Sequence, residues 1–197
     1  MEISFLGDVH GRFNEYKELY ASVPLLYQLG DMGIGFNERK DKEFPNIPNH
    51  YFIRGNHDNP NKVNNFPGYL GNFGISNHGL FFVSGALSID RAFRILGKNY
   101  WDDEQLNYEQ MNNAVELYHQ TKPDFVISHD APESIYYKVC PDAHKIPSST
   151  SKGLDFMFNI HQPKYWFMGH FHKNIVFEFQ NTIFRVIDTM NIFNFNI

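Results

Sequence analysis

The chain has 197 residues, of which 42% are hydrophobic, and its formal net charge at pH 7 is −5. This length predicts one domain, covering residues 1–197, that can bury a substantial core, and the negative charge argues against an extended nucleic-acid-binding surface. The single cysteine, Cys140, excludes a disulfide within the chain and is expected to be a bystander rather than a nucleophile. Since the sequence shows neither a secretory signal nor a stretch long enough to span a membrane, we expect a cytoplasmic protein.

The N-terminal part begins with a pattern typical of a strand–helix–strand unit. Short apolar runs predict strands over residues 3–6 and 25–29, and apolar side chains at helical spacing predict a helix over residues 13–22 between them. Such a unit implies two parallel strands joined by a right-handed crossover. A third strand is predicted over residues 51–54, after a polar loop over residues 33–50.

The rest of the chain continues to alternate between strands, helices and loops. Predicted strands cover residues 80–84, 125–128, 165–168, 175–179 and 183–187, and a hairpin turn joins the last two. Predicted helices cover residues 104–120, capped by Asp102 or Asp103, and residues 154–160. Loops are expected over residues 59–77, 88–101 and 132–151. These elements indicate an α/β fold with a β-rich C-terminal part.

Five short blocks that contain Asp, Asn or His each follow directly after an apolar run. They are Gly7-Asp8-Val9-His10-Gly11, Gly30-Asp31, Gly55-Asn56-His57-Asp58, Ser128-His129-Asp130 and Gly169-His170-Phe171-His172. The ligand crevice of an open α/β sheet lies at the carboxyl ends of its strands, so we expect these blocks to converge. The candidate metal ligands within them are Asp8, His10, Asp31, Asn56, His129, His170 and His172.

This ligand set contains two carboxylates, four imidazoles and one amide. Mixed oxygen and nitrogen donors suit Mn, Fe, Zn, Co or Ni better than Ca or Mg. The set is too large for one ion that keeps open positions, but it fits two ions roughly 3.5–4 Å apart. The sequence therefore predicts a centre of two divalent metal ions, with Mn²⁺ as the first choice.

The ordered set D-x-H, G-D, G-N-H-(D/E), H and G-H-x-H resembles the signature of the calcineurin-like metallophosphoesterase superfamily, and here it spans Asp8 to His172. The resemblance implies a four-layer αββα sandwich of two mixed sheets flanked by helices. It implies a first metal held by Asp8, His10, Asp31 and His172, and a second held by Asp31, Asn56, His129 and His170, with Asp31 as the bridge.

The resemblance also implies a mechanism for phosphate-ester hydrolysis. Two ions clamp phosphate oxygens and lower the pKa of a bridging water, and the resulting hydroxide attacks phosphorus. His57, as an imidazolium, is expected to protonate the leaving group, and Asp58 is expected to orient the ring of His57.

Two departures weaken an assignment to the phosphoprotein phosphatases of this superfamily. The residues after Gly30-Asp31 lack the arginine that grips phosphate in those enzymes, and Asp58 stands where they have Glu. Candidate phosphate contacts on other segments are Arg12, Arg54 and Arg91. Arg91 is our first choice because it follows a predicted strand.

The favoured function is metal-dependent hydrolysis of a small phosphate ester or nucleotide, with a phosphomonoester somewhat favoured. Because 197 residues leave little chain for a cap domain, we expect an open crevice, which suits a small phosphomonoester or an accessible phosphodiester. A second hypothesis is a phosphodiesterase or nuclease acting on cyclic nucleotides, dinucleoside polyphosphates or nucleic acid, since these enzymes use the same metal blocks. A third is a noncatalytic metal-binding scaffold of the same fold. The presence of His57 argues against the scaffold, because the scaffold protein that resembles this fold lacks the general acid.

Overall fold

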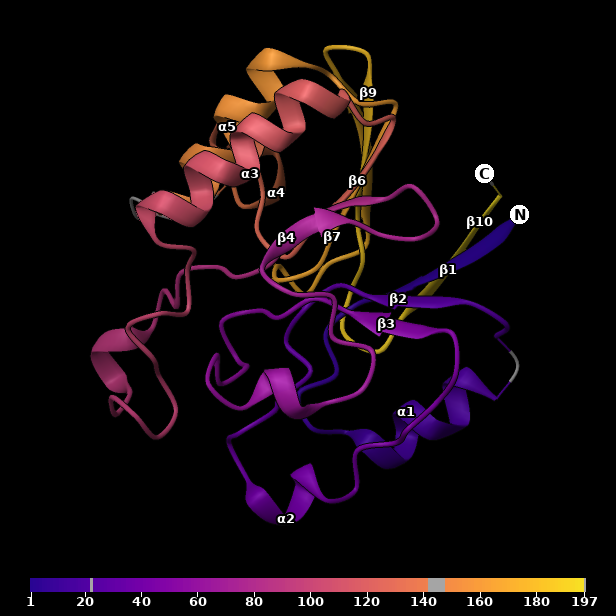
Figure 1. The fold of residues 1–197 in the computed structure, drawn as a ribbon, viewed down its shortest axis with the longest axis vertical. Helices are drawn as coiled ribbons and strands as arrows, with labels where there is room; N and C mark the ends of the chain where they lie inside the picture. The colour runs from indigo at the N-terminus through magenta and orange to yellow at the C-terminus, as the bar shows by residue number, and fades with distance from the viewer. Residues whose placement is uncertain (22, 142–147, 197) are drawn as a thin grey trace.

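The computed structural model describes residues 1–21, 23–141 and 148–196 of the chain. Its first sheet has the strand order β10-β1-β2-β3. The parallel strands are β1 (Glu2–Leu6), β2 (Leu26–Gln28) and β3 (His50–Phe52), and β10 (Ile192–Asn196) is antiparallel at the edge. The two ends of the chain therefore lie side by side along β1 and β10 (Figure 1). The parallel pairing of β1 with β2 confirms the predicted strand–helix–strand unit.

The second sheet has the strand order β4-β5-β6-β7-β9-β8. Its four central strands are parallel, and they are β5 (Phe81–Val83), β6 (Phe125–Ser128), β7 (Tyr165–Met168) and β9 (Thr182–Val186). The antiparallel edge strands are β4 (Phe73–Ile75) and β8 (Ile175–Phe179). Gln180 and Asn181 join β8 to β9 with φ angles of 47° and 67°, which a tight hairpin turn of the primed type requires.

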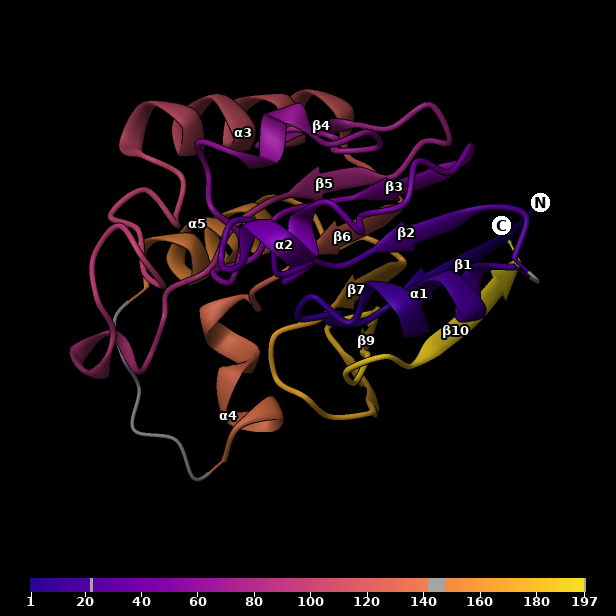
Figure 2. The same cartoon turned by 90° about the horizontal axis from the view of Figure 1, so that it is seen from below.

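Helices lie on the outer sides of the two sheets, as Figures 1 and 2 show. On the side of the first sheet are α1 (Phe13–Tyr20) and the short α2 (Glu38–Asp41). On the side of the second sheet are α3 (Tyr108–Thr121), α4 (Tyr136–Val139) and α5 (Ser149–Ile160). Single turns of 3₁₀ helix occupy Val63–Asn65, Arg91–Phe93 and Glu133–Ile135. The four-layer αββα sandwich of two mixed sheets is thus confirmed.

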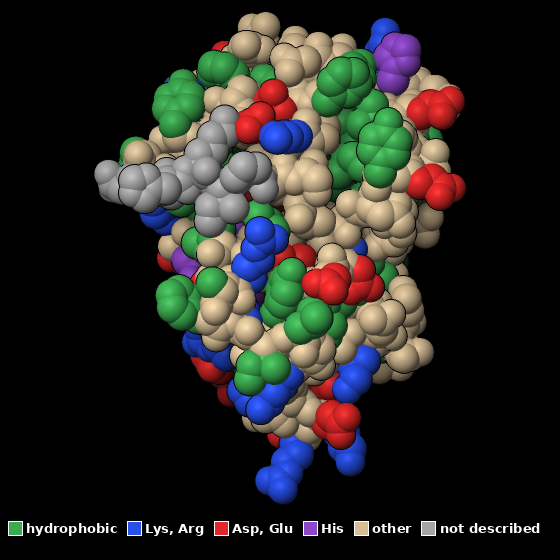
Figure 3. Space-filling view, turned by 90° about the vertical axis from the view of Figure 1, so that its left-hand side faces the viewer, with side chains coloured by type: hydrophobic (Ala, Val, Ile, Leu, Met, Phe, Trp, Pro, Cys, Tyr) green, Lys and Arg blue, Asp and Glu red, His purple; other side chains and the backbone are tan. Residues whose placement is uncertain are grey.

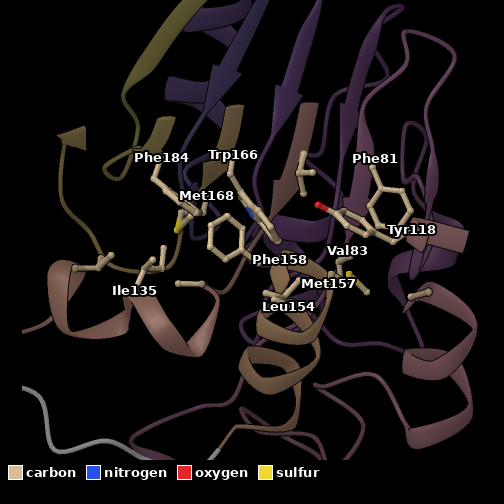
Figure 4. Close-up of a cluster of buried hydrophobic side chains, with 14 of the residues drawn as sticks. Phe81, Val83, Tyr118, Ile135, Leu154, Met157, Phe158, Trp166, Met168 and Phe184 are labelled. Atoms are coloured by element: carbon tan, nitrogen blue, oxygen red, sulfur yellow. The ribbon is translucent and has the colours of Figure 1, made fainter. Parts of the chain in front are cut away.

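Three hydrophobic clusters hold the four layers together. Between the sheets, the ring of Phe5 stacks on that of Phe167 with centroids 4.1 Å apart. Alternation along β5 sends Phe82 into this inner layer, whereas Phe81 faces the helices on the outer side. Figure 4 shows that outer cluster, in which Phe158 of α5 packs against Trp166 of β7. A third cluster joins α1 to the outer face of the first sheet.

Several elements differ from the sequence predictions. β10 was not predicted, although residues 193–196 alternate between apolar and polar side chains, and β4, α2 and α4 lie in segments expected to be loops. The helix expected over residues 104–120 begins later, because Asn107 rather than Asp102 or Asp103 caps it. The Asn107 side chain accepts from the Gln110 N–H, and the Gln110 side chain accepts in return from the Asn107 N–H.

None of the helices formed by the described residues is long and apolar enough to cross a membrane.

Candidate metal centre

The carboxyl ends of parallel strands from both sheets meet at one place, and the predicted ligands lie there. In the first sheet, Asp8, Asp31 and Asn56 follow β1, β2 and β3; in the second sheet, His129 follows β6, and His170 and His172 follow β7. The sheets come into direct contact at this point, since His129 Nε2 lies 3.1 Å from Asp31 Oδ1. The ligand candidates therefore come from two sheets that pack face to face.

Asp8, His10 and His172 form a first group of potential metal ligands. Asp8 Oδ2 lies 3.0 Å from His172 Nε2 and 3.5 Å from His10 Nε2, and the two imidazole nitrogens are 3.1 Å apart. Among the described residues, Asp8 Oδ2 has no hydrogen-bond partner of adequate geometry although it is buried. Because a buried carboxylate oxygen without a partner is unfavourable, these three atoms suit a cation between them.

Asp31, His129 and His170 form a second group of potential ligands. His129 Nδ1 donates to the Leu29 carbonyl over 2.7 Å, which turns His129 Nε2 toward Asp31 Oδ1 and toward Asn56 Oδ1, 3.3 Å away. Burial alone would lower the pKa of His129, but the charge of Asp31 raises it to about 10. The geometry thus favours a positive charge at Nε2, and a metal ion can take the place of that proton.

Asp31 lies between the two groups. Its Oδ1 faces His129, whereas its Oδ2 lies 4.0 Å from His10 Nε2 in the first group. The backbone N–H of His57 donates to Asp31 Oδ1 over 2.7 Å, which holds the carboxylate in this orientation. Opposite charge on the neighbouring imidazoles outweighs burial and keeps the pKa of Asp31 well below its usual range. An ionised carboxylate with one oxygen toward each group can bridge two metal ions.

The backbone at the site is strained. Asp31, His10, His170 and His172 have φ angles of 57°, 50°, 70° and 49°. Each such left-handed residue costs about 1–3 kcal/mol and persists only where the surrounding structure enforces it. One such restraint is the His170 N–H, which donates to Asp8 Oδ1 over 3.0 Å. Strain concentrated on four of the predicted ligands indicates a preorganised functional site.

Two glycines of the sequence blocks leave room for the ligands. A Cβ at Gly55 would lie 2.0 Å from Asp31 Oδ1 and 2.5 Å from His129 Nε2, and a Cβ at Gly30 would lie 2.3 Å from His129 Nδ1. Gly30 also has a φ of 98°, which a side chain would disfavour. The glycine that precedes Asp31 and the glycine that precedes Asn56 therefore allow the close approach of the two sheets.

His57 lies beside both groups, but its protonation differs from the sequence expectation. Arg94 Nη2 donates to His57 Nε2 over 2.7 Å, so this nitrogen carries no proton in the structure. Burial lowers the pKa of His57 to about 4, and the charge of Arg94 adds to that effect, against the opposing charge of Asp31. This contact favours a neutral His57 ring over the imidazolium expected from the sequence, because the permanently charged Arg94 guanidinium can only donate and His57 Nε2 must then accept.

Asp58 does not orient the His57 ring, which corrects the sequence expectation. Its carboxylate is fully buried and accepts the backbone N–H groups of Met32, Gly33, Ile34 and Gly55 over 2.8–3.1 Å. Burial and the charge of Asp31 raise the pKa of Asp58 to about 6, although these N–H groups oppose the shift. Asp58 therefore ties the loop after β2 to the loop after β3.

A cavity of about 540 Å³ opens over the candidate ligands. Its walls combine Asp31, Asn56, His170 and His172 with the polar pair His57 and Arg94 and the apolar side chains of Ile89, Tyr136 and Phe171. This volume is within the range of small-molecule sites. A second cavity of about 170 Å³, lined by Lys40 and Phe36, lies on another side of His57.

The predicted arginines do not line the larger cavity. Arg91 is exposed on the loop over residues 88–101, and Arg12 pairs with Glu15 on α1. Arg54 is buried, and its Nη1 donates to the Glu104 carbonyl. The arginine that lines this cavity is Arg94, which was not predicted. Arg91 and Arg94 lie in the same irregular loop, and the sequence of such a loop has no periodic pattern that indicates which side chain faces the cavity.

Comparisons with known proteins agree with this arrangement. A family model described as calcineurin-like phosphoesterase matches residues 1–174. A lariat debranching enzyme of Entamoeba histolytica is 26% identical over 204 aligned positions, which cover 87% of this chain and 56% of that protein. The chain thus spans about half the length of this curated relative.

Two solved structures are similar to this chain at low sequence identity. A hypothetical protein from Thermus thermophilus matches with a TM-score of 0.50 and 16% identity, covering 96% of this chain and 77% of that one. A predicted phosphoesterase from Streptococcus pneumoniae matches with a TM-score of 0.44 and 12% identity, covering 95% of this chain and 72% of that one.

Proposed function

Because the chain belongs to the calcineurin-like phosphoesterase family, whose members are hydrolases acting on ester bonds, we propose that it hydrolyses a small phosphate ester at a centre of two divalent metal ions. The observation that carries this proposal is the convergence of two ligand groups on Asp31, beside a buried Asp8 oxygen that has no hydrogen-bond partner of adequate geometry among the described residues. The carboxylate oxygens and imidazole nitrogens of such a site suit divalent cations.

We assign the ligands to two sites that share Asp31. Asp8, His10, Asp31 and His172 hold one ion, and Asp31, Asn56, His129 and His170 hold the other. The ligand atoms are nitrogen and oxygen, with no thiolate among them. Several divalent ions bind to such ligands, and Mn²⁺ is the one that we favour. When bound, the ions supply Lewis acidity toward the phosphate oxygens and activate water as the nucleophile.

His57 and Arg94 act on the substrate from the wall of the cavity. Arg94 presents a charged guanidinium, which stabilises the negative charge that develops on the phosphoryl oxygens. Negative charge of a bound phosphate raises the pKa of the neighbouring His57. When Arg94 turns from His57 to the phosphate, Nε2 of His57 becomes free to take a proton and to deliver it to the leaving oxygen.

A phosphomonoester is our first candidate substrate. Its terminal phosphate carries more negative charge than a diester, and the Arg94 guanidinium at the cavity can bind that charge. A phosphodiester with a nucleotide component is the second candidate, and two observations support it. Cavities lie on two sides of His57, which provides space for an organic group on either side of the phosphorus atom. The relative from Entamoeba histolytica carries the name of a debranching enzyme.

Hydrolysis by metal-stripped protein, with and without added Mn²⁺, tests the proposal. We expect Mn²⁺-dependent turnover of p-nitrophenyl phosphate, whereas faster turnover of bis-p-nitrophenyl phosphate supports the diester candidate. His57→Ala is expected to lower turnover on the order of 10²-fold while metal content stays unchanged, since a general acid typically contributes this much. Bound metal with no turnover of either ester contradicts the enzyme and favours the scaffold.

Arg94→Ala is expected to lower kcat/KM on the order of 10²-fold, because one preorganised donor to the reacting oxygens is lost. Arg91→Ala is the matched control, since it removes the same charge from the same loop but outside the cavity. We expect the control to keep the parental kcat/KM when both variants are measured at saturating Mn²⁺. Equal losses in the two variants would mean that the loop contributes only its overall charge.

A further inference from the structure

A chain of buried hydrogen bonds leads from Asn56 to Ser88 and Glu104. Asn56 Nδ2 donates to Ser88 Oγ over 3.2 Å, and Ser88 Oγ donates to Glu104 Oε2 over 2.7 Å. The backbone N–H of Ser88 donates to Glu104 Oε1, also over 2.7 Å. The three residues are 3%, 1% and 2% exposed, so solvent does not compete for these bonds. We infer that Ser88 and Glu104 are positioning residues that orient the Asn56 amide for its metal ion, an inference that rests on the proposed function.

The direction of the bonds determines which end of the Asn56 amide faces the ligand group. An asparagine side chain has an oxygen that can bind a metal and an NH₂ that cannot. The Glu104 carboxylate only accepts, so it takes the single hydroxyl proton of Ser88. Ser88 Oγ can then only accept from Asn56, which draws Nδ2 toward Ser88 and turns Oδ1 toward His129. A reversed Asn56 amide would place Oδ1 of Asn56 against Oγ of Ser88, and neither oxygen would have a proton to donate to the other.

The fold holds Glu104 firmly in this place. Its carbonyl accepts from Arg54 Nη1 over 2.5 Å, and Arg54 directly precedes Gly55 in the ligand block. A Cβ at Gly85 would lie 2.5 Å from the same carbonyl, so the close approach depends on that glycine. Ser88 and Glu104 also stand at the two ends of the loop that carries Arg94. One pair of residues therefore joins the base of this loop to a proposed metal ligand.

Metal affinity separates this positioning role from a merely structural one. We expect Ser88→Ala to weaken Mn²⁺ binding at one of the two sites about 10–100-fold, as loss of a partner that orients a ligand typically does. Isothermal titration of the metal-stripped protein measures both sites without using activity. Ser4→Ala is the matched control, because Ser4 is a buried serine that donates to Asn194 away from the site. Unchanged affinity at both sites in Ser88→Ala overturns the inference.

Glu104→Gln tests the direction of the bonds. The Gln NH₂ can donate to Ser88 Oγ, which frees the Ser88 proton to point at Asn56 and favours the reversed amide. We therefore expect Glu104→Gln to weaken the same site as Ser88→Ala, although every hydrogen bond of the chain can still form. Parental affinity in this variant contradicts the inference.

A double-mutant cycle shows whether Ser88 acts through Asn56. We expect Asn56→Ala to weaken one site and the Asn56→Ala/Ser88→Ala pair to bind no more weakly than Asn56→Ala alone. Additive losses overturn the inference but leave the proposed function intact. A parental protein that binds no Mn²⁺ overturns both, so the two failures are distinguishable.

Discussion

Asp31→Asn is expected to abolish metal-dependent hydrolysis, lowering kcat/KM by at least about 10⁴-fold. Asp31 directs one oxygen to each ligand group, and an amide can present only one oxygen without charge. Loss of the shared ligand removes a charge of −1 from both sites, so the transition state loses about 5 kcal/mol of stabilisation at 1.36 kcal/mol per factor of ten. Turnover with Mn²⁺ and metal content by elemental analysis measure the two effects together.

Asp41→Asn is the control for this variant, because the Asp41 carboxylate, at the end of α2, accepts from the Gly35 N–H and lies outside both ligand groups. We expect it to keep its metal and its turnover. If Asp31→Asn retained two ions per chain and the parental rate, Asp31 would not be the bridge, and the assignment of ligands to two sites would have to be abandoned.

Asp58→Ala is expected to lower the free energy of unfolding by about 4 kcal/mol at pH 8. At that pH the Asp58 carboxylate, with a pKa of about 6, is ionised. Its removal leaves four backbone N–H groups from two loops without their acceptor, and each orphaned buried donor is unfavourable. The urea midpoint followed by circular dichroism, with an unchanged slope, measures the loss.

Asp124→Ala is the comparison, since the exposed Asp124 carboxylate pairs with Lys164 at the surface. Exposed ion pairs contribute about 0–1 kcal/mol, so we expect its midpoint to stay close to the parental value. An Asp58→Ala protein of parental stability that had lost hydrolysis would return Asp58 to the role of orienting His57.

The sequence predicted the location of the site better than the connections around it. Apolar runs locate the ends of buried strands, and parallel strands bring those ends together, so the convergence of Asp8, Asp31 and His129 follows from pattern and topology. The partners of Asp58 could not be predicted in this way. They are backbone N–H groups, and their direction depends on the path of a loop that no sequence period describes.

The sequence predictions also failed at the edge of the first sheet and in the irregular loop over residues 88–101. β10 pairs with β1 across nearly the whole length of the chain, and no local signal identifies such a partner. Arg94 contacts His57 and donates two hydrogen bonds to the Asp90 carboxylate, which hold its guanidinium in place. Arg91, on the adjacent 3₁₀ turn, is exposed and does not line the cavity. Figure 3 shows the face on the left-hand side of Figure 1, where hydrophobic side chains are interspersed with Lys, Arg, Asp and Glu side chains.

The separation of the ligands along the chain bears on how the protein matures. His10 and His172 are 162 positions apart, and each ligand group combines a residue from the first 31 positions with one from beyond position 128. Contacts of such long range form late in folding, because closing large loops loses much chain entropy before any contact compensates for it. During synthesis, a nascent chain therefore exposes its N-terminal carboxylates and imidazole long before it can enclose an ion. The two proposed metal sites are complete only when residues 170 and 172 have left the ribosome and the second sheet has docked on the first.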